Sequence, residues 1–109
     1  MSDAAALERL RAMLDGPRDG ALLRVSLANA LRGAGQADEA IAELRRALEF
    51  DAGYSAAWKL LGTALAERGD AAGAIDAYRA GIEAAENRGD KQASKEMQVF
   101  LRRLEKKHS

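Results

Sequence analysis

The side chains that could carry out chemistry are few in this sequence and poorly placed for it. The only histidine is His108, one residue before the C-terminus, where nothing would hold its imidazole against a substrate or a metal. Cysteine is absent, so the sequence offers neither a thiolate nucleophile nor a thiolate metal ligand. No nucleophile, base and orienting group can be assembled from these residues. We therefore expect a protein that is not an enzyme, with no catalytic residue, no metal site and no cofactor.

The acidic residues are numerous, but their positions indicate structural roles. Three aspartates stand at expected helix starts, where a carboxylate accepts hydrogen bonds from free backbone N–H groups: Asp38, Asp70 and Asp90. The stretch Gly33-Ala34-Gly35 follows a helix rather than a strand and lacks the lysine of a phosphate-binding loop. The two Arg-Gly-Asp triplets, at 68–70 and 88–90, are interpreted as a loop glycine followed by an N-cap.

A basic run from Arg102 to Lys107 lies near the C-terminal end of the sequence. Positive charge at a helix C-terminus complements the helix dipole, which is our first interpretation of this run. The alternative is a surface for acidic partners, RNA or phospholipid. No aromatic residue stands among these cations to stack on a base, which disfavours RNA.

The composition fits one domain with an aliphatic core. The chain has 109 residues, of which 48% are hydrophobic and only 5% aromatic, so alanine and leucine must form most helix contacts. The formal net charge is 0, which argues against a dedicated nucleic-acid binder. No apolar run approaches the ~20 residues of a membrane span, and the first 14 residues do not have the pattern of a signal peptide. With cysteine absent, we expect a cytoplasmic protein.

Hydrophobic periodicity predicts six helices in a single domain that covers residues 1–109. Glycine-containing turns separate most of them. The expected helices cover about 4–14, 20–33, 37–50, 55–68, 71–87 and 90–106.

The stretch from Trp58 to Tyr78 predicts two helices that pack closely. Its first half places a large and a small residue, Trp58 and Gly62, on one helix face. Gly69-Asp70 then breaks the helix and supplies the N-cap of the next. We expect Trp58 to be a core anchor between the two helices. The tightest contacts are expected at three small residues, Gly62, Ala74 and Gly81.

The same pattern recurs 34 residues apart. Five residues of one copy have like residues in the other: Leu61, Leu65, Gly69, Ala74 and Ile75 correspond to Leu27, Leu31, Gly35, Ala40 and Ile41. The first helix aligns with the second half of a further copy. The predicted organisation is a half-repeat helix at 4–14, full repeats at 21–54 and 55–88, and a capping helix at 90–106. The first full repeat carries Arg24 where the second carries Trp58.

This pattern resembles the tetratricopeptide repeat, W-x2-L-G-x2-Y, then A-x3-F, then P. The matching residues are Trp58, Leu61, Gly62 and Ala74, with Tyr78 in place of Phe, Leu65 in place of Tyr and Glu86 in place of Pro. The resemblance implies an all-α fold of antiparallel helix-hairpin repeats. These would stack as a right-handed superhelical α-solenoid with capping helices at both ends.

The resemblance also implies a non-catalytic scaffold or adaptor whose first helices line a concave groove for a protein or peptide. The expected groove residues are Val25, Asn29, Arg32, Lys59, Thr63, Glu67, Lys91 and Lys95. Some relatives grip a C-terminal carboxylate with Lys and Asn on successive first helices. Here Asn29 matches that clamp but Val25 and Leu60 do not. Lys59 beside Val25 and Asn29 favours an extended acidic or C-terminal peptide.

Two other functions stay open at the sequence level. One is self-association through an end helix, because Val99 and Phe100 point to different sides of the last helix. The other is weak binding of an anionic surface or RNA through the basic C-terminal helix. We expect a monomer, with a homodimer as the alternative, and neither a nucleic acid nor a membrane as partner.

Overall fold

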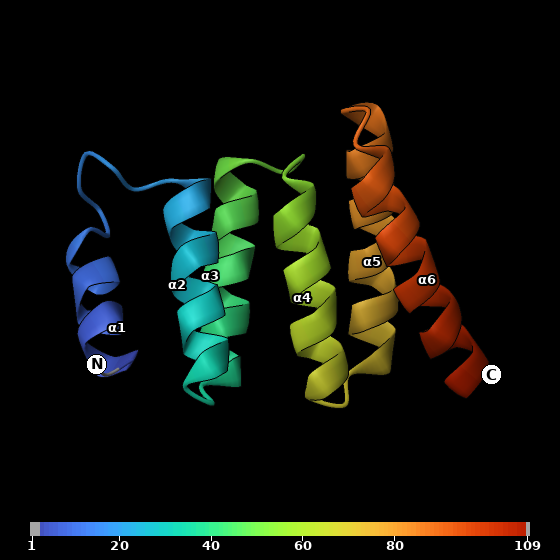
Figure 1. The fold of residues 1–109 in the computed structure, drawn as a ribbon, viewed down its shortest axis with the longest axis horizontal. Helices are drawn as coiled ribbons and strands as arrows, with labels where there is room; N and C mark the ends of the chain where they lie inside the picture. Colours follow the sequence, from blue (N-terminus) through green and yellow to red (C-terminus); the bar gives the residue numbers. More distant parts are fainter. Residues whose placement is uncertain (1–2, 109) are drawn as a thin grey trace.

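The computed structural model describes residues 3–108 and forms six α-helices in sequence (Figure 1). They are α1 (Asp3–Ala12), α2 (Ala21–Gly33), α3 (Ala37–Phe50), α4 (Ser55–Glu67), α5 (Ala71–Asn87) and α6 (Lys91–Lys107). From α2 onward, the predicted helix ends agree with the structure to within one residue. The first helix ends two residues earlier than expected, because the chain turns at Met13 and Leu14 and Asp15 has a positive φ of 62°.

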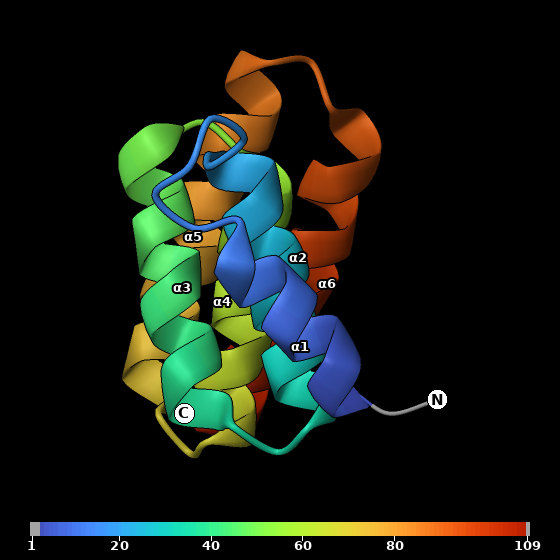
Figure 2. The same ribbon diagram turned by 90° about the vertical axis from the view of Figure 1, so that its left-hand side faces the viewer.

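The helices are stacked as consecutive antiparallel hairpins, α2 with α3 and α4 with α5 (Figure 1). Helix α1 packs on α2 at one end of the stack, and α6 packs on α5 and α4 at the other. The view along the stack shows α3 and α5 together on one side and α1, α2 and α6 on the other (Figure 2). The first helices of the hairpins also touch one another, α2 with α4 and α4 with α6. The all-α hairpin stack predicted from the sequence is confirmed.

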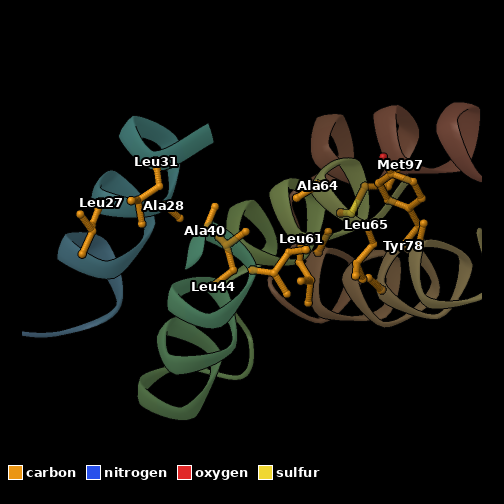
Figure 3. Close-up of a cluster of buried hydrophobic side chains, with 14 of the residues drawn as sticks. Leu27, Ala28, Leu31, Ala40, Leu44, Leu61, Ala64, Leu65, Tyr78 and Met97 are labelled. Atoms are coloured by element: carbon orange, nitrogen blue, oxygen red, sulfur yellow. The ribbon is translucent and has the colours of Figure 1, made fainter. Parts of the chain in front are cut away.

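One continuous apolar core runs through the stack (Figure 3). Its largest fully buried side chains are Leu27, Leu31, Leu44 and Met97. The small residues expected at tight contacts are buried: Ala74 is 0% exposed, and Gly62 and Gly81 each lie against side chains of a neighbouring helix. A Cβ added at Gly81 would stand 2.7 Å from the Cβ of Trp58, so α4 and α5 approach more closely there than an alanine would allow.

The loops after α4 and α5 have the same structure, a glycine with positive φ followed by an aspartate N-cap. Gly69 and Gly89 adopt positive φ, at 90° and 74°, which glycine does without steric cost. The next residue caps the following helix: Asp70 accepts from the Gly73 N–H at 2.9 Å and Asp90 from the Ala93 N–H at 3.1 Å. Each Arg-Gly-Asp triplet is therefore a helix connection.

Asp38 does not cap a helix as expected. Gln36 is the N-cap residue of α3, without a side-chain cap bond, and Asp38 lies in the first turn of that helix. Its carboxylate instead forms an ion pair with Arg68 at the end of α4. The aspartate therefore links the two repeats, and its negative charge near a helix N-terminus is also favourable.

Trp58 is less buried than a core anchor should be. Its side chain is only partly covered, although it packs against the core cluster. The indole N–H donates to the Ala52 carbonyl at 2.8 Å, which fixes the ring edge to the turn between α3 and α4. Two hollows of about 390 and 400 Å³ have Trp58 in their lining. The Trp58 ring therefore lies at the periphery of the contact between the two hairpins rather than at its centre.

Candidate functional site: the concave face of the first helices

The helices α2, α4 and α6 form the side of the stack where the sequence predicted a groove, which we call the concave face. Two ion pairs link these helices. Arg32 on α2 donates to the Glu67 carboxylate on α4 through Nε at 3.2 Å and through Nη2 at 2.7 Å. Lys59 on α4 donates to Glu96 on α6 at 3.0 Å. The sequence predicted Arg32, Lys59 and Glu67 for this face but did not identify Glu96.

These ion pairs change what the cations of the face can do. The charge of Lys59 is balanced by Glu96 and that of Arg32 by Glu67 before any partner arrives. An acidic peptide would have to compete with a carboxylate already in place. Partly exposed pairs of this kind contribute about 0–1 kcal/mol to stability, so they constrain the charge of a partner more than they stabilise the fold.

A row of uncharged side chains lies on the same side of α2. Leu22, Val25 and Asn29 are spaced i, i+3 and i+7, so they share one helix face. Leu22 is 69% exposed, Val25 is partly buried and Asn29 is exposed. The Asn29 side chain makes no hydrogen bond within residues 3–108, so its amide is open to a partner. Leu22 was not among the groove residues predicted from the sequence, although its i, i+3 and i+7 spacing to Val25 and Asn29 places it on their face.

Thr63 is partly buried, and its hydroxyl is bonded within the protein. Its hydroxyl donates to the Lys59 carbonyl at 3.0 Å and lies 2.9 Å from the Tyr78 hydroxyl. Because the single proton of Thr63 is used on the carbonyl, the Tyr78 hydroxyl is the donor to Thr63. Burial raises the pKa of Tyr78, which keeps that hydroxyl protonated.

The closing helix turns a different face toward α4 than expected. Lys91 and Lys95 are exposed and line a hollow of about 400 Å³ beside Glu86 and Gly89, at the end of α5. The residues that face α4 instead are Gln92, Ala93 and Glu96, which border a hollow of about 250 Å³ with Ser55, Ala56 and Lys59.

A register shift explains this difference. Helix α6 begins 36 residues after α4 rather than 34. On that spacing buried Met97 corresponds to buried Leu61, and Ser94 and Gln98 stand where α4 has Trp58 and Gly62. Gln98 donates to the Ser94 hydroxyl at 2.9 Å. In α6, the polar pair Ser94 and Gln98 thus stands where Trp58 and Gly62 of α4 pack against the following helix. Polar side chains at these positions suit the last helix of a stack, which has no further helix to cover it.

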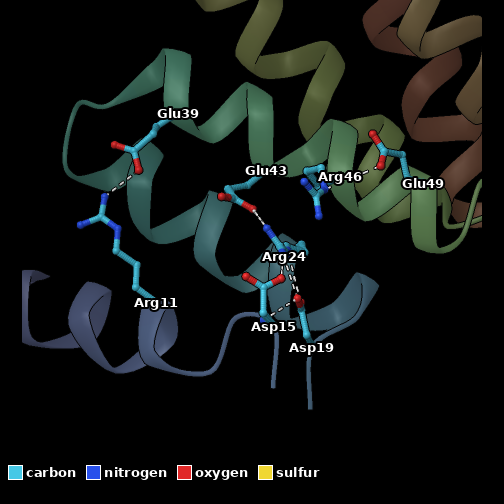
Figure 4. Close-up of polar contacts among 8 residues, drawn as sticks. All are labelled: Arg11, Asp15, Asp19, Arg24, Glu39, Glu43, Arg46 and Glu49. Carbon is cyan, nitrogen blue, oxygen red and sulfur yellow. Dashed lines mark hydrogen bonds and ion pairs between the residues drawn. The ribbon is translucent and has the colours of Figure 1, made fainter. Parts of the chain in front are cut away.

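The most buried charged side chain, Arg24, lies away from the concave face. It binds carboxylates that anchor the segment between α1 and α2 (Figure 4). Arg24 is 4% exposed, binds Asp19 through two nitrogens at 2.9 and 2.7 Å, and donates to Glu43 at 2.8 Å. The Arg24 guanidinium holds the pKa of Asp19 at about 2, and the two carboxylates raise the pKa of Arg24. This network is structural, because every member is already paired.

Among residues 3–108, no three His, Asp or Glu side chains are gathered closely enough to hold a metal ion. In the same residues, no helix combines the length and the apolar character that a membrane crossing requires. The large apolar side chains most exposed in the described chain are Leu22 and Phe50, and neither lies on α6. Phe100, considered above for self-association, packs on the Tyr78 ring with centroids 5.7 Å apart.

Comparison with known proteins gives a consistent result. A family model described as "Tetratricopeptide repeat" matches residues 31–95. The chain is 48% identical over 100 residues to TPR repeat-containing protein PA0015 of Pseudomonas aeruginosa, covering 92% of this chain and 95% of that protein. It is also similar to the solution structure of protein BPP2914 from Bordetella parapertussis, with a TM-score of 0.80, 50% identity, and coverage of 93% of this chain and 88% of that one. The Sgt2 TPR domain from Aspergillus fumigatus matches with a TM-score of 0.81 and 30% identity, covering 96% of this chain and 67% of that one.

Proposed function

Because the chain belongs to the tetratricopeptide repeat family, whose domains generally bind proteins, we propose that it is a non-catalytic module that binds a protein or peptide segment on its concave face. The contact residues we propose are Leu22 and five residues predicted from the sequence on α2 and α4, namely Val25, Asn29, Arg32, Lys59 and Glu67. Thr63 is left out because its hydroxyl is bonded within the protein. Lys91 and Lys95 are left out of this surface because they line the hollow beside α5.

The observation that carries this proposal is the exposure of Leu22. A leucine that is 69% exposed on the first helix of a hairpin leaves apolar area in water, and binding a partner there would recover it. Val25 extends the apolar surface by one turn, and the Asn29 amide can both donate to and accept from a peptide backbone. These three side chains suit an extended segment with one apolar anchor.

The ion pairs favour a partner whose contacting residues are uncharged. Arg32 and Lys59 already face Glu67 and Glu96, so a carboxylate on the partner gains little from either cation. This differs from the acidic or C-terminal peptide that Lys59 suggested when only the sequence was considered. Three first helices give a short groove, so we expect micromolar affinity.

Peptides selected from a random phage-displayed library on the immobilised chain provide the test. We expect the selected peptides to contain an apolar residue and to bind at least about tenfold more weakly, or 1.4 kcal/mol, to the double variant Leu22→Ser/Asn29→Ala. Phe50→Ser is the matched control, because Phe50 is also a strongly exposed large apolar residue but lies at the end of α3. A loss of binding in the Phe50 variant alone would place the site elsewhere.

A further inference from the structure

The charge of the chain is unevenly distributed, although its formal total is 0. Helix α6 carries six Lys or Arg and two Glu, a net charge of +4, so the remaining residues carry −4. A positive charge near the end of a helix is favourable, but that reason applies only to the last turn. Lys91 and Lys95 stand near the N-terminal end of α6, where the helix dipole opposes them.

Both carboxylates of α6 are directed to its flanks. Glu96 accepts from Lys59 of α4 at 3.0 Å, and Glu105 accepts from Arg79 of α5 at 2.8 Å. The two acids are thus used in holding α6 against the stack. They leave the outward side of the helix with one sign of charge.

The outward cations form a line along α6. At 100° per residue, Lys91, Lys95 and Arg102 fall within about 40° of one another, and Lys106 extends the arc to about 60°. All four are exposed, and the line is about 22 Å long at 1.5 Å per residue. For Lys91, Lys95 and Arg102, the described part of the chain supplies no ion-pair partner. We call these four residues the α6 stripe.

We propose that the α6 stripe binds an acidic peptide segment whose carboxylates are spaced along one helix face. The charge complementarity is direct, because a helix with glutamates at i, i+4, i+11 and i+15 repeats the spacing of the stripe. This surface is separate from the concave face, so it can act whether or not that face binds a peptide.

The shape and surroundings of the stripe favour a narrow ligand over a broad one. Glu86 lines the same hollow as Lys91 and Lys95, so a flat anionic membrane that reached both lysines would also meet this carboxylate. A single helical peptide is narrow enough to lie along the exposed side of α6 without contacting Glu86. The aromatic ring of α6, Phe100, packs against Tyr78 and is not presented on the stripe for stacking on a nucleic-acid base.

The test uses the full chain and two alanine-rich helical peptides of identical composition. One carries four glutamates at the spacing of the stripe, and the other carries them distributed around the helix. Fluorescence anisotropy should show saturable binding of the aligned peptide, at least about tenfold tighter than that of the rearranged one. Equal binding of the two peptides, or no saturable binding, would overturn the proposal.

Charge-reversal variants locate the site. Lys95→Glu/Arg102→Glu should weaken the aligned peptide at least tenfold. The control Arg9→Glu/Arg45→Glu changes the net charge equally, at exposed residues of α1 and α3, and should retain binding. An equal loss in both variants would reduce the effect to net charge and reject the stripe. If circular dichroism shows that the reversed α6 variant does not fold, the neutralising pair Lys91→Gln/Lys95→Gln is measured in its place. Tighter binding of phosphatidylserine vesicles or of an RNA homopolymer than of the aligned peptide would also reject the peptide as ligand.

Discussion

The ring of Tyr78 lies directly against the backbone of Gly62: a Cβ added at Gly62 would stand 2.5 Å from the Cε1 atom of Tyr78. The ring cannot move aside easily, because its face packs on Phe100 and its hydroxyl is bonded to Thr63. These contacts come from α4, α5 and α6. One glycine therefore determines how closely the second hairpin and the closing helix approach.

Gly62→Ala should destabilise the fold, although alanine is the better helix former by about 1 kcal/mol. Overpacking a rigid contact costs about 1–3 kcal/mol, so the steric term should prevail. Gly33→Ala is the control, because a Cβ at Gly33, the last residue of α2, would meet no atom within 4 Å. Urea unfolding followed by circular dichroism measures both variants. Equal midpoints for the two would show that the Tyr78 ring yields.

Arg24 should be essential to the first hairpin. Arg24→Ala leaves Asp19 and Glu43 without their shared cation, and removing one member of a buried ion pair costs about 3–5 kcal/mol. We expect about 3 kcal/mol, because water can reach the part of Glu43 that remains exposed. Arg46→Ala is the comparison, since its pair with Glu49 is exposed and should change the free energy of unfolding by less than about 0.5 kcal/mol. An Arg24 variant as stable as the Arg46 variant would contradict the anchoring role.

The same network should make stability depend on acid pH. The pKa of Asp19 is lowered from 3.8 to about 2 by its hydrogen bonds to Arg24, so the ionised form stabilises the fold. This contribution is fully present above pH 4 and is lost as the pH falls toward 2. The difference in unfolding free energy between wild type and Asp19→Asn should therefore be constant at neutral pH and shrink across that interval. In an Arg24→Ala background the difference should be small at every pH. If the pH-dependent difference in unfolding free energy persisted in the Arg24→Ala background, a group other than Arg24 would be responsible for the lowered pKa of Asp19.

The sequence predicted best where one residue type is required locally. A glycine that must adopt positive φ and an aspartate that caps the next helix marked the loops at Gly69-Asp70 and Gly89-Asp90. Gly62 and Gly81 were identifiable as tight contacts because large and small residues stand at fixed places on the faces of the two helices. These features depend on short segments and a known period.

Features that depend on spatial partners were beyond such reasoning. The two-residue shift of α6 moved Lys91 and Lys95 away from α4, and only the packing of Met97 reveals that register. Arg24 stood where the repeat has Trp58, but its carboxylate partners come from a loop and from α3. Periodicity places Leu22 on the face of Val25 and Asn29, but it does not show that the Leu22 side chain stays uncovered there; only the packing of the helices reveals that exposure.

Removing α6 should expose the surface that it covers. Deletion of residues 89–109 uncovers apolar side chains of α5, including the face of Tyr78 that packs on Phe100. A stack without a polar closing helix tends to aggregate. We expect the truncated chain to bind a hydrophobic dye and to elute as large particles in size-exclusion chromatography. A monomeric truncation with the full helical signal of α1–α5 would show that α6 is dispensable for folding.

Trp58 should contribute less to stability than a buried tryptophan and should be visible to solvent. Because the ring is only partly covered, Trp58→Ala should cost about 2 kcal/mol rather than the 3–5 kcal/mol typical of a buried aromatic residue. Leu61→Ala, on the same helix and 2% exposed, is the matched control and should cost at least as much despite its smaller side chain. Trp58 is the only tryptophan, so acrylamide quenching of the intrinsic fluorescence reports on this residue alone. Quenching should lie between that of a free indole and that of a buried one. A Trp58→Ala cost well above that of Leu61→Ala, together with no quenching, would restore Trp58 to the buried core.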